Sequence, residues 1–367
     1  MEGFYIAALQ MVPGMGIAAV SALLKFLSSP RSAWEATGDE LAAMPELTTQ
    51  QRENLLAFRG QNRSLPEKLA EECKKKQISV CTQADNIYPE ILKEISRPPL
   101  VLFYRGRLQP DELRLAMVGS RKATPYGKNV AEALAREIAA QGITVVSGAA
   151  YGIDTASHKG ALATGKTIAV LGCGVDIAYP ASNRRLLDEI AENGAVVSEY
   201  APGTRPIAAF FPARNRIISG LSRGTVVVEA AERSGSLITA EMALSEGRDV
   251  FAVPGSIFSE QSRGTNRLIQ QGAKLVQSAD DVLNEYITVT RSTAENVAAD
   301  LKLTDEETAV YRLLSAEQPV SIDDIICRLN GSNVSNVAFL LLQMELKGLV
   351  EEDCDHNYLK VVKEGQL

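Results

Sequence analysis

The residues best suited to bind an anion lie close together in residues 210–243. Arg214 and Arg216 flank Asn215, where the pattern predicts that a helix begins. The apolar run 225–228 is typical of a strand covered on both faces. Small polar residues then open the next predicted helix: Ser234, Gly235, Ser236 and Thr239. Guanidinium groups and unpaired backbone N–H groups at helix starts bind phosphate, so this stretch predicts a site for a phosphate-bearing ligand.

Further small and basic residues follow the other predicted strands of the same region. In a parallel sheet the loops after the strands meet at one edge, where ligands bind. Gly and Ser there let a phosphate approach the backbone, and Arg can hold it through two parallel hydrogen bonds. The small residues are Gly119, Ser120, Ser147 and Gly148. The basic residues are Arg121, Arg205, Arg214 and Arg216, with Lys166 as a further member.

Phe211 stands just before the pair of arginines. An aromatic ring beside arginines is suited to stack on unpaired bases, which contributes about 1–3 kcal/mol per base. The alternative is that Phe211 packs in the core and that one arginine is paired with Glu199 or Glu229.

Two other patterns suggest chemistry that their context does not support. Residues 160–167 read GALATGKT and match the P-loop pattern. A P-loop needs a strand before its glycines and a helix after its Lys, whereas here the predicted helix comes first. We therefore interpret Gly165 as the end of a helix. The chain has no GxGxxG dinucleotide fingerprint, so no cofactor is expected.

His158 lies one helical turn from Asp154 and next to Ser157. Adjacent helical residues do not face each other, so Ser157 and His158 do not form a nucleophile–base pair. We interpret His158 as a hydrogen-bonded structural residue and Asp154 as a helix N-cap. No catalytic residue is expected, and two His with no CxxC pair argue against a metal site.

Strand and helix patterns alternate through the middle of the chain, which predicts a doubly wound, mostly parallel α/β sheet of extended Rossmann-like type. Strands are predicted at 115–119, 143–147, 167–171, 195–198, 225–229, 250–253 and 273–276, with 78–81 and 100–104 as extensions. Helices are predicted at 126–141, 154–165, 183–192, 214–221, 237–245 and 265–271.

Four parts are expected along the chain: a helical module at 1–62, the α/β core at 63–287, a linker at 288–302 and a winged helix at 303–367. The first module has a Pro13-Gly14-Met15-Gly16 turn between helical patterns, which resembles a helix-hairpin-helix or sterile-alpha-motif-like fold. It can contact DNA phosphates through glycine N–H groups, or serve only as a small packing domain. The expected recognition helix of the winged module, 333–346, contains no Lys or Arg, which favours protein binding over DNA binding.

The net charge is −7, but charge is unevenly distributed. Residues 115–277 contain 17 Lys and Arg against 14 Asp and Glu, whereas residues 301–367 contain 6 against 12. The middle is therefore the expected polyanion binder. Five cysteines, no signal-peptide pattern and no apolar run near about 20 residues predict a cytosolic protein without a membrane span.

The order of motifs across residues 77–276 resembles the DNA-processing protein A family, also called DprA or Smf. The matching motifs are Gly119-Ser120-Arg121, Gly152-Ile153-Asp154, Tyr179-Pro180, Phe211-Pro212, Arg214-Asn215-Arg216, Ser234-Gly235-Ser236, Pro254-Gly255 and Gly264-Thr265-Asn266. The flanking modules also resemble those of the longer members.

The resemblance implies a core that binds single-stranded DNA without sequence preference. It also implies a homodimer that loads the RecA recombinase onto incoming strands during natural transformation. Carried over by motif, the DNA contacts are Ser120, Arg121, Arg205, Phe211, Arg214 and Asn215.

Two other classes of function remain open from the sequence. The lysine-decarboxylase-like hydrolases of nucleoside monophosphates have a similar sheet and a PGGxGTxxE motif. Here the corresponding segment, 234–241, lacks the Gly-Gly pair but ends in Glu241. The third possibility is a scaffold whose core binds nothing.

Overall fold

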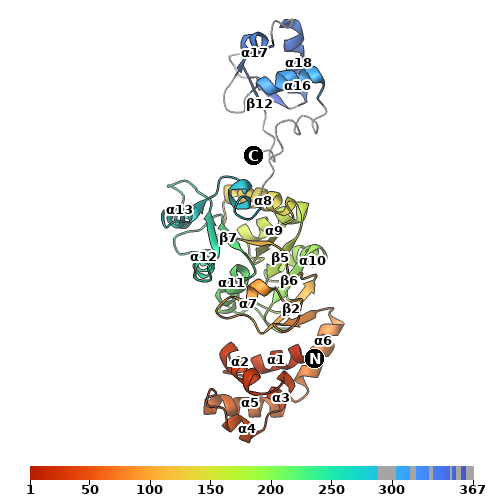
Figure 1. Ribbon diagram of the computed structural model, residues 1–367, viewed down its shortest axis with the longest axis vertical. Helices are drawn as coiled ribbons and strands as arrows, with labels where there is room; N and C mark the ends of the chain where they lie inside the picture. The colour runs from red at the N-terminus through yellow and green to blue at the C-terminus, as the bar shows by residue number, and fades with distance from the viewer. Residues whose placement is uncertain (288–302, 315–319, 330–333, 348, 353–356, 361–367) are drawn as a thin grey trace. The chain divides into compact units, whose positions relative to one another are not determined.

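The computed structural model describes residues 1–287, 303–314, 320–329, 334–347, 349–352 and 357–360. The chain forms two compact units, Met1–Val282 and Leu283–Leu367 (Figure 1). The boundary expected at residue 62 lies inside the first unit and stays a prediction, and the expected linker 288–302 lies outside the described residues. Among the described residues, no helix is long and apolar enough to cross a membrane.

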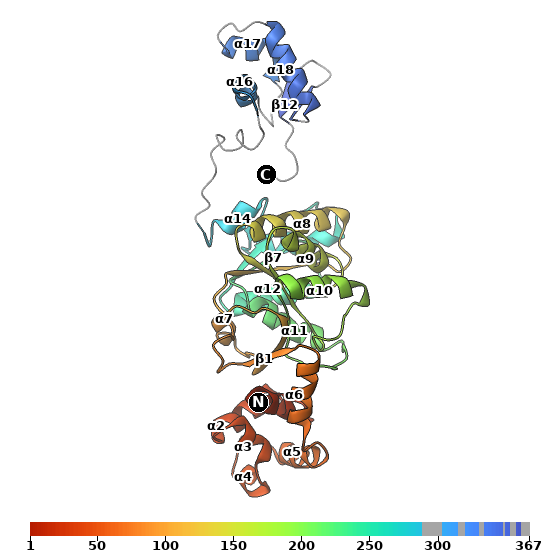
Figure 2. The same ribbon diagram turned by 90° about the vertical axis from the view of Figure 1, so that its right-hand side faces the viewer.

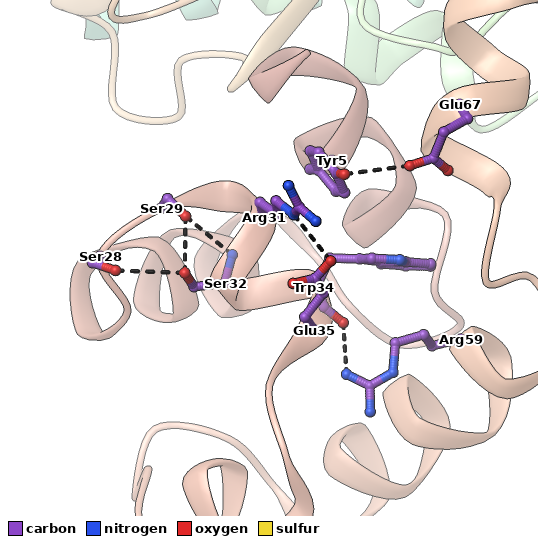
Figure 3. A network of polar contacts seen from close by, with 9 residues as sticks. All are labelled: Tyr5, Ser28, Ser29, Arg31, Ser32, Trp34, Glu35, Arg59 and Glu67. Carbon is purple, nitrogen blue, oxygen red and sulfur yellow. Dashed lines mark hydrogen bonds and ion pairs between the residues drawn. The ribbon is translucent and has the colours of Figure 1, made fainter.

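Six short helices form the N-terminal part: α1 (Glu2–Gln10), α2 (Ile17–Phe26), α3 (Pro30–Glu35), α4 (Gly38–Ala42), α5 (Thr49–Gln61) and α6 (Leu65–Lys75). Side chains stabilise their ends: Thr37 and Thr48 both form capping boxes. Arg59 of α5 donates to the Trp34 carbonyl at 2.6 Å and so ties α5 to α3, as the network in Figure 3 shows. The turn at Gly14 has φ +78°, a conformation that favours glycine.

The N-terminal helices pack on one end of a large sheet. Gly3 of α1 lies against β1 (Ser79–Thr82), where an added Cβ would come within 2.8 Å of the Val80 side chain. Buried residues of α1, such as Leu9, share one hydrophobic cluster with Phe103 of β2 (Val101–Gly106). Burial of this shared apolar surface joins the two parts into one unit.

The sheet has nine strands in the order β1-β2-β6-β5-β4-β3-β7-β8-β9. Strands β1 and β2 are antiparallel to their neighbours, and the other seven are parallel. Their bounds are β3 (Arg114–Val118), β4 (Thr144–Ser147), β5 (Thr167–Val170), β6 (Ala195–Ser198), β7 (Gly224–Val227), β8 (Asp249–Ala252) and β9 (Lys274–Leu275). The predicted doubly wound, mostly parallel fold is confirmed, because the buried strands have the continuous apolar sequences that two covered faces require.

Helices cover both faces of the sheet. They are α7 (Glu90–Lys93), α8 (Pro125–Ala140), α9 (Ile153–Thr164), α10 (Arg184–Asn193), α11 (Phe210–Gly220), α12 (Gly235–Ser245), α13 (Arg263–Gln270) and α14 (Ala279–Leu283). In Figure 1, α8, α9 and α10 lie on one side of the sheet and α11 and α12 on the other; in Figure 2, after a quarter turn, α8, α9 and α10 face the viewer.

The glycines of the P-loop-like segment serve helix packing. Gly160 of α9 faces α8 so closely that an added Cβ would lie 2.1 Å from the Glu132 carbonyl oxygen. At Gly165 an added Cβ would lie 2.6 Å from the Ala139 carbonyl oxygen. Gly165 follows α9 and precedes β5. The order of helix, glycine and strand is therefore the reverse of the order in a P-loop, as predicted.

The second unit has the elements of the predicted winged helix. They are α16 (Asp305–Leu313), α17 (Ile322–Arg328), α18 (Val334–Leu346) and a sheet of β10 (Val320–Ser321), β12 (Asn357–Lys360) and β11 (Val350–Glu352). Thr304 and Glu307 form a capping box at the start of α16. On α18, Leu341 and Met344 are buried whereas Phe339 and Leu342 are exposed.

Gly160 packs against α8, whereas Gly60 has free space beside it. Replacing each glycine by Ala should therefore change the free energy of unfolding in opposite directions. Gly160→Ala should lower the free energy of unfolding by about 1–3 kcal/mol, because the backbone of α8 must move. Gly60→Ala in α5 meets no atom within 4 Å and should raise it by up to about 1 kcal/mol. Urea unfolding followed by circular dichroism measures both, and equal midpoints for the two variants would contradict the packing.

Candidate nucleic-acid interface

A pocket of about 630 Å³ lies at the carboxyl edge of the sheet. Its walls come from the ends of β3 and β7 and from the first turns of α11 and α12. Strands β4, β5 and β6 are added in turn on one side of β3, whereas β7 and the strands after it lie on the other side of β3. This is the topological switch point at which open α/β sheets bind ligands.

The structure brings together most of the predicted site residues. Those that line the pocket are Gly119, Ser120, Arg121, Phe211, Arg214, Asn215, Ser234, Gly235, Ser236 and Thr239. Ser147 ends the neighbouring strand β4 and Gly148 follows it; Ser147 is buried and donates to the Met117 carbonyl at 2.7 Å. Arg205, Arg216 and Lys166 are not among the lining residues.

Backbone contacts hold the loop after β3 in one conformation. The Ser120 N–H donates to the Glu229 carbonyl at 2.7 Å, and the Ser120 carbonyl accepts from the Ile153 N–H at 3.2 Å. An added Cβ at Gly119 would lie 2.6 Å from the Ile153 side chain, so this position needs glycine. The loop therefore presents the exposed side chain of Arg121 from a fixed backbone.

The Glu229 carboxylate is committed to a helix start. Buried at the end of β7, it accepts from the Thr124 N–H at 2.9 Å and from the Thr124 hydroxyl at 2.5 Å. Thr124 is the N-cap of α8. Glu229 thus stabilises α8 at the pocket edge and forms none of the ion pairs among the described residues; of the two carboxylates considered as partners of an arginine, it is Glu199 that is paired.

The start of α12 has the small polar character that the sequence predicted. Ser234 is the N-cap, and its hydroxyl lies 2.7 Å from the Ser236 hydroxyl. Gly235 is exposed, with no atom within 4 Å of an added Cβ. The Asn215 side chain donates to the Gly235 carbonyl at 3.3 Å and connects α11 to this turn. The Ser236 N–H donates to the Ser234 hydroxyl at 3.4 Å, and Gly235 adjoins an uncrowded part of the pocket.

Arg214 departs from its predicted role as a phosphate ligand. Helix α11 begins at Phe210, with Pro212 in its first turn, so Arg214 lies one turn inside the helix rather than at its start. Its side chain is buried and donates to the carbonyls of Gly148, at 2.8 Å, and Val170. Both bonds are made by Nη1, so Arg214 joins these two strand ends while it also lines the pocket.

The charge of Arg214 is matched by a buried carboxyl group. Asp154 is buried nearby and accepts from the Ala150 N–H at 3.3 Å. Burial raises the pKa of Asp154, and the positive charge of Arg214 opposes that shift. Burial also lowers the pKa of Arg214 to about 10, which leaves the guanidinium charged at neutral pH. The prediction that Asp154 caps α9 is wrong, because the cap position is Gly152.

Two other predicted cations are committed to carboxylates. Arg216 forms an ion pair with Glu199 at 2.5 Å, with side-chain exposures of 15% and 8%. This confirms the alternative in which one arginine is paired with Glu199. Lys166 directly precedes β5, so it lies at the amino edge of the sheet, opposite the pocket, where it pairs with Glu112 at 2.7 Å. The prediction that Lys166 belongs to the basic residues of the site is therefore wrong.

Arg205 is exposed on the loop between β6 and α11. The loop is closed by the stacked rings of Tyr200 and Phe210, with centroids 4.1 Å apart. The Thr204 carbonyl accepts from the Gly174 N–H at 2.9 Å. Arg205 therefore stands beside the pocket on an ordered loop, next to the lining residue Pro206.

Phe211 is half-buried and has two close neighbours. The Arg121 Cζ lies 5.4 Å from the centre of its ring, and the Tyr179 ring lies 5.1 Å from it at 31°. Tyr179 and the exposed Lys122 also line the pocket. The site prediction omitted both. Lys122 adjoins Arg121 and was detectable by that position, whereas only the Tyr179-Pro180 motif pointed to Tyr179.

His158 has the structural role that was predicted. It is buried in α9, and its Nδ1 lies 2.7 Å from the Thr167 hydroxyl oxygen. Burial, with a smaller contribution from the charge of Arg214, lowers the pKa of His158 to about 3. The imidazole is therefore neutral at physiological pH and lies away from the lining of the pocket.

The acidic residue on which the hydrolase alternative depends lies outside the pocket. Glu241 is exposed on α12 and is not among the lining residues of the pocket. A general acid or base must reach the reacting atoms. The geometry therefore does not favour nucleoside monophosphate hydrolysis.

Two family models match this chain. Residues 79–287 match the family model described as DNA recombination-mediator protein A, and residues 294–353 match that of the DprA winged helix domain. The chain is 51% identical over 204 residues to DNA processing protein DprA of Streptococcus pneumoniae, which covers 55% of this chain and 72% of that protein. It is 33% identical to Protein Smf of Synechocystis sp. over 97% of this chain and 98% of that protein.

Two solved structures are also similar. The X-ray structure of DprA from Streptococcus pneumoniae has a TM-score of 0.68 at 39% identity, covering 78% of this chain and 99% of that one. DNA processing protein A from Helicobacter pylori, whose structure was described for its single-stranded DNA binding mode, has a TM-score of 0.52 at 33% identity, covering 57% and 95%. The chain therefore belongs to the DNA recombination-mediator protein A family, known as DprA or Smf, and has a DNA-processing role.

Proposed function

We propose that the pocket and its rim bind single-stranded DNA without sequence preference. The observation that carries this proposal is the exposed Arg121 guanidinium, which lies over the Phe211 ring at the mouth of a pocket at the sheet's switch point. A cation and an aromatic surface side by side suit a phosphate and its neighbouring base. The single-stranded DNA binding described for the Helicobacter pylori relative supports the same ligand.

The groups around the pocket suit a backbone-directed contact. Arg121 and Lys122 supply positive charge, and the start of α12 at Gly235 supplies the positive end of a helix dipole. Arg205 extends the positive charge along the neighbouring loop. Phosphates and sugars carry no sequence information, so this set of groups predicts binding that is tolerant of sequence.

We further propose that the protein acts as a homodimer that loads the RecA recombinase onto the bound strand during natural transformation or general recombination. The family membership supports this role. In this proposal the protein is a mediator without catalytic activity of its own, and it acts in the cytosol, where the strand and the recombinase meet. The winged helix is assigned to protein contacts, in line with the exposed Phe339 and Leu342 on α18.

Arg121→Ala should weaken binding of oligo(dT) about 10- to 100-fold, because a charge-assisted contact with phosphate is lost. It should also lower the slope of log K against log salt by about 0.7, the value for one phosphate contact on a single strand. Fluorescence anisotropy at several salt concentrations measures both quantities. Lys166→Ala is the matched control, since it removes an exposed cation at the opposite edge. Equal losses in the two variants would count against the site.

Arg214→Met should affect folding and binding together. It leaves the Gly148 carbonyl without this donor and leaves Asp154 buried without its counter-charge, at a cost of about 1–3 kcal/mol for each unpaired group. We expect a lower thermal midpoint and weaker DNA binding, whereas Arg121→Ala should leave the midpoint unchanged. Differential scanning calorimetry with and without oligonucleotide tests this; a midpoint equal to that of the unchanged protein would show that Arg214 is not structural.

RecA loading predicts a further difference between the same variants. On single-stranded DNA coated with single-strand-binding protein, the unchanged protein and Lys166→Ala should shorten the lag before RecA hydrolyses ATP. Arg121→Ala should not, because it no longer holds the strand. A lag that no variant shortens, despite intact DNA binding, would reject the loading role and retain the DNA-binding one.

A further inference from the structure

The aromatic ring beside Arg121 is not the one with the most open surface. Phe211 is contacted by the Tyr179 ring at 5.1 Å and by the Arg121 Cζ at 5.4 Å from its centre. Both distances are typical of ring–ring and cation–ring contacts, so these neighbours already use the π surface of Phe211. A base that stacked directly on Phe211 would have to displace one of them.

Tyr179 is the exposed member of this group. Its exposure is 44%, whereas Phe211 is half-buried. Tyr179 lines the main pocket and also a smaller adjoining one, which it shares with Arg121, Phe211 and Tyr151. The exposed Tyr179 ring and the exposed Arg121 therefore both contact Phe211 and border the same two pockets, so a nucleotide held by Arg121 would have the Tyr179 ring within the same site.

The backbone that carries Tyr179 is firmly held on both sides. Before it, the Ile177 N–H donates to the Gly174 carbonyl at 2.9 Å. After it, the buried Asn183 side chain donates to the Ala149 carbonyl at 3.0 Å and to the Thr155 hydroxyl at 2.9 Å. An aromatic ring on a fixed backbone loses little conformational entropy when a ligand stacks on it.

We propose that Tyr179 is a base-stacking residue of the DNA site and that Phe211 serves as the support behind it. Arg121, Phe211 and Tyr179 then form one continuous column, in which the cation holds a phosphate and the outer ring accepts a base of single-stranded nucleic acid. The inference rests on the proposed function of the pocket. It adds a subsite for the base, with tolerance of any base because every base has a π face.

The experiment compares oligo(dT) with an oligomer of the same length and backbone that lacks bases. Tyr179→Ala should bind oligo(dT) about 5- to 150-fold more weakly, the range that corresponds to about 1–3 kcal/mol of stacking. Its binding to the abasic oligomer should equal that of the unchanged protein. Arg121→Ala should lose affinity for both oligomers, because it acts on the backbone.

Two further variants keep the test independent of folding. Tyr179→Phe retains the ring and should bind oligo(dT) normally, whereas Tyr179→Leu fills the space beside Phe211 without a π face and should reproduce the loss. Tyr126→Ala is the matched control, since Tyr126 is similarly exposed at 51% but is absent from the lining of both pockets. Quenching of 2-aminopurine in the bound strand should fall in Tyr179→Leu and persist in Tyr179→Phe.

The two proposals fail in different ways. If the unchanged protein binds neither oligomer, the DNA-binding function fails and the stacking subsite fails with it. If it binds both oligomers and Tyr179→Leu matches it on oligo(dT), the stacking role of Tyr179 is overturned while the DNA site stands. Equal losses by Tyr179→Leu on both oligomers would also overturn it, because they would indicate a general disturbance of the loop.

Discussion

The buried guanidinium of Arg214 is the contact on which the pocket depends. It reaches from α11 to the carbonyls of Gly148 and Val170, which follow or end two neighbouring strands, β4 and β5. A planar group with several donors can join such strand ends in a way that no apolar side chain can. Its burial requires a compensating charge, which Asp154 supplies. The loops around the pocket are therefore fixed before any ligand arrives.

Arg214 and Arg216 have different partners in the structure, which their spacing in the sequence could not reveal. Arg214 is buried against backbone carbonyls, and Arg216 is paired with Glu199. The sequence pattern predicted the residue types, the pocket edge and the doubly wound sheet, because apolar strands and glycine turns are local signals. It placed the start of α11 four residues late, since Pro212 was not recognised as part of a first turn. That shift moves Arg214 into the interior and aims Arg216 at Glu199. A helix that began at residue 214 would have Arg214 at its exposed end. Because α11 begins at Phe210, Arg214 lies one turn inside the helix and is buried.

Other errors arose where the neighbours are far apart in the sequence. Lys166 precedes its strand by one residue and so falls on the wrong edge, a distinction that composition does not show. Tyr179, Phe211 and Arg121 come from three separate loops or helix starts and meet only in the folded sheet. The predictions for His158 and for the P-loop-like segment were confirmed, because each depended on element order within one stretch of chain.

The side chains of the pocket suggest why the proposed site would bind single-stranded DNA without preference for its base sequence. Discrimination between bases needs side chains whose donors and acceptors face the base edges. Here the Asn215 amide donates to the Gly235 carbonyl, and the Ser234 and Ser236 hydroxyls lie within hydrogen-bond distance of each other. Exposed groups of the pocket such as Arg121, Lys122 and the Tyr179 ring offer charge and π surface, and in the proposed site these would contact features that all nucleotides share. In the proposed site, tolerance of sequence would follow because Asn215, Ser234 and Ser236 bind other groups of the protein rather than base edges.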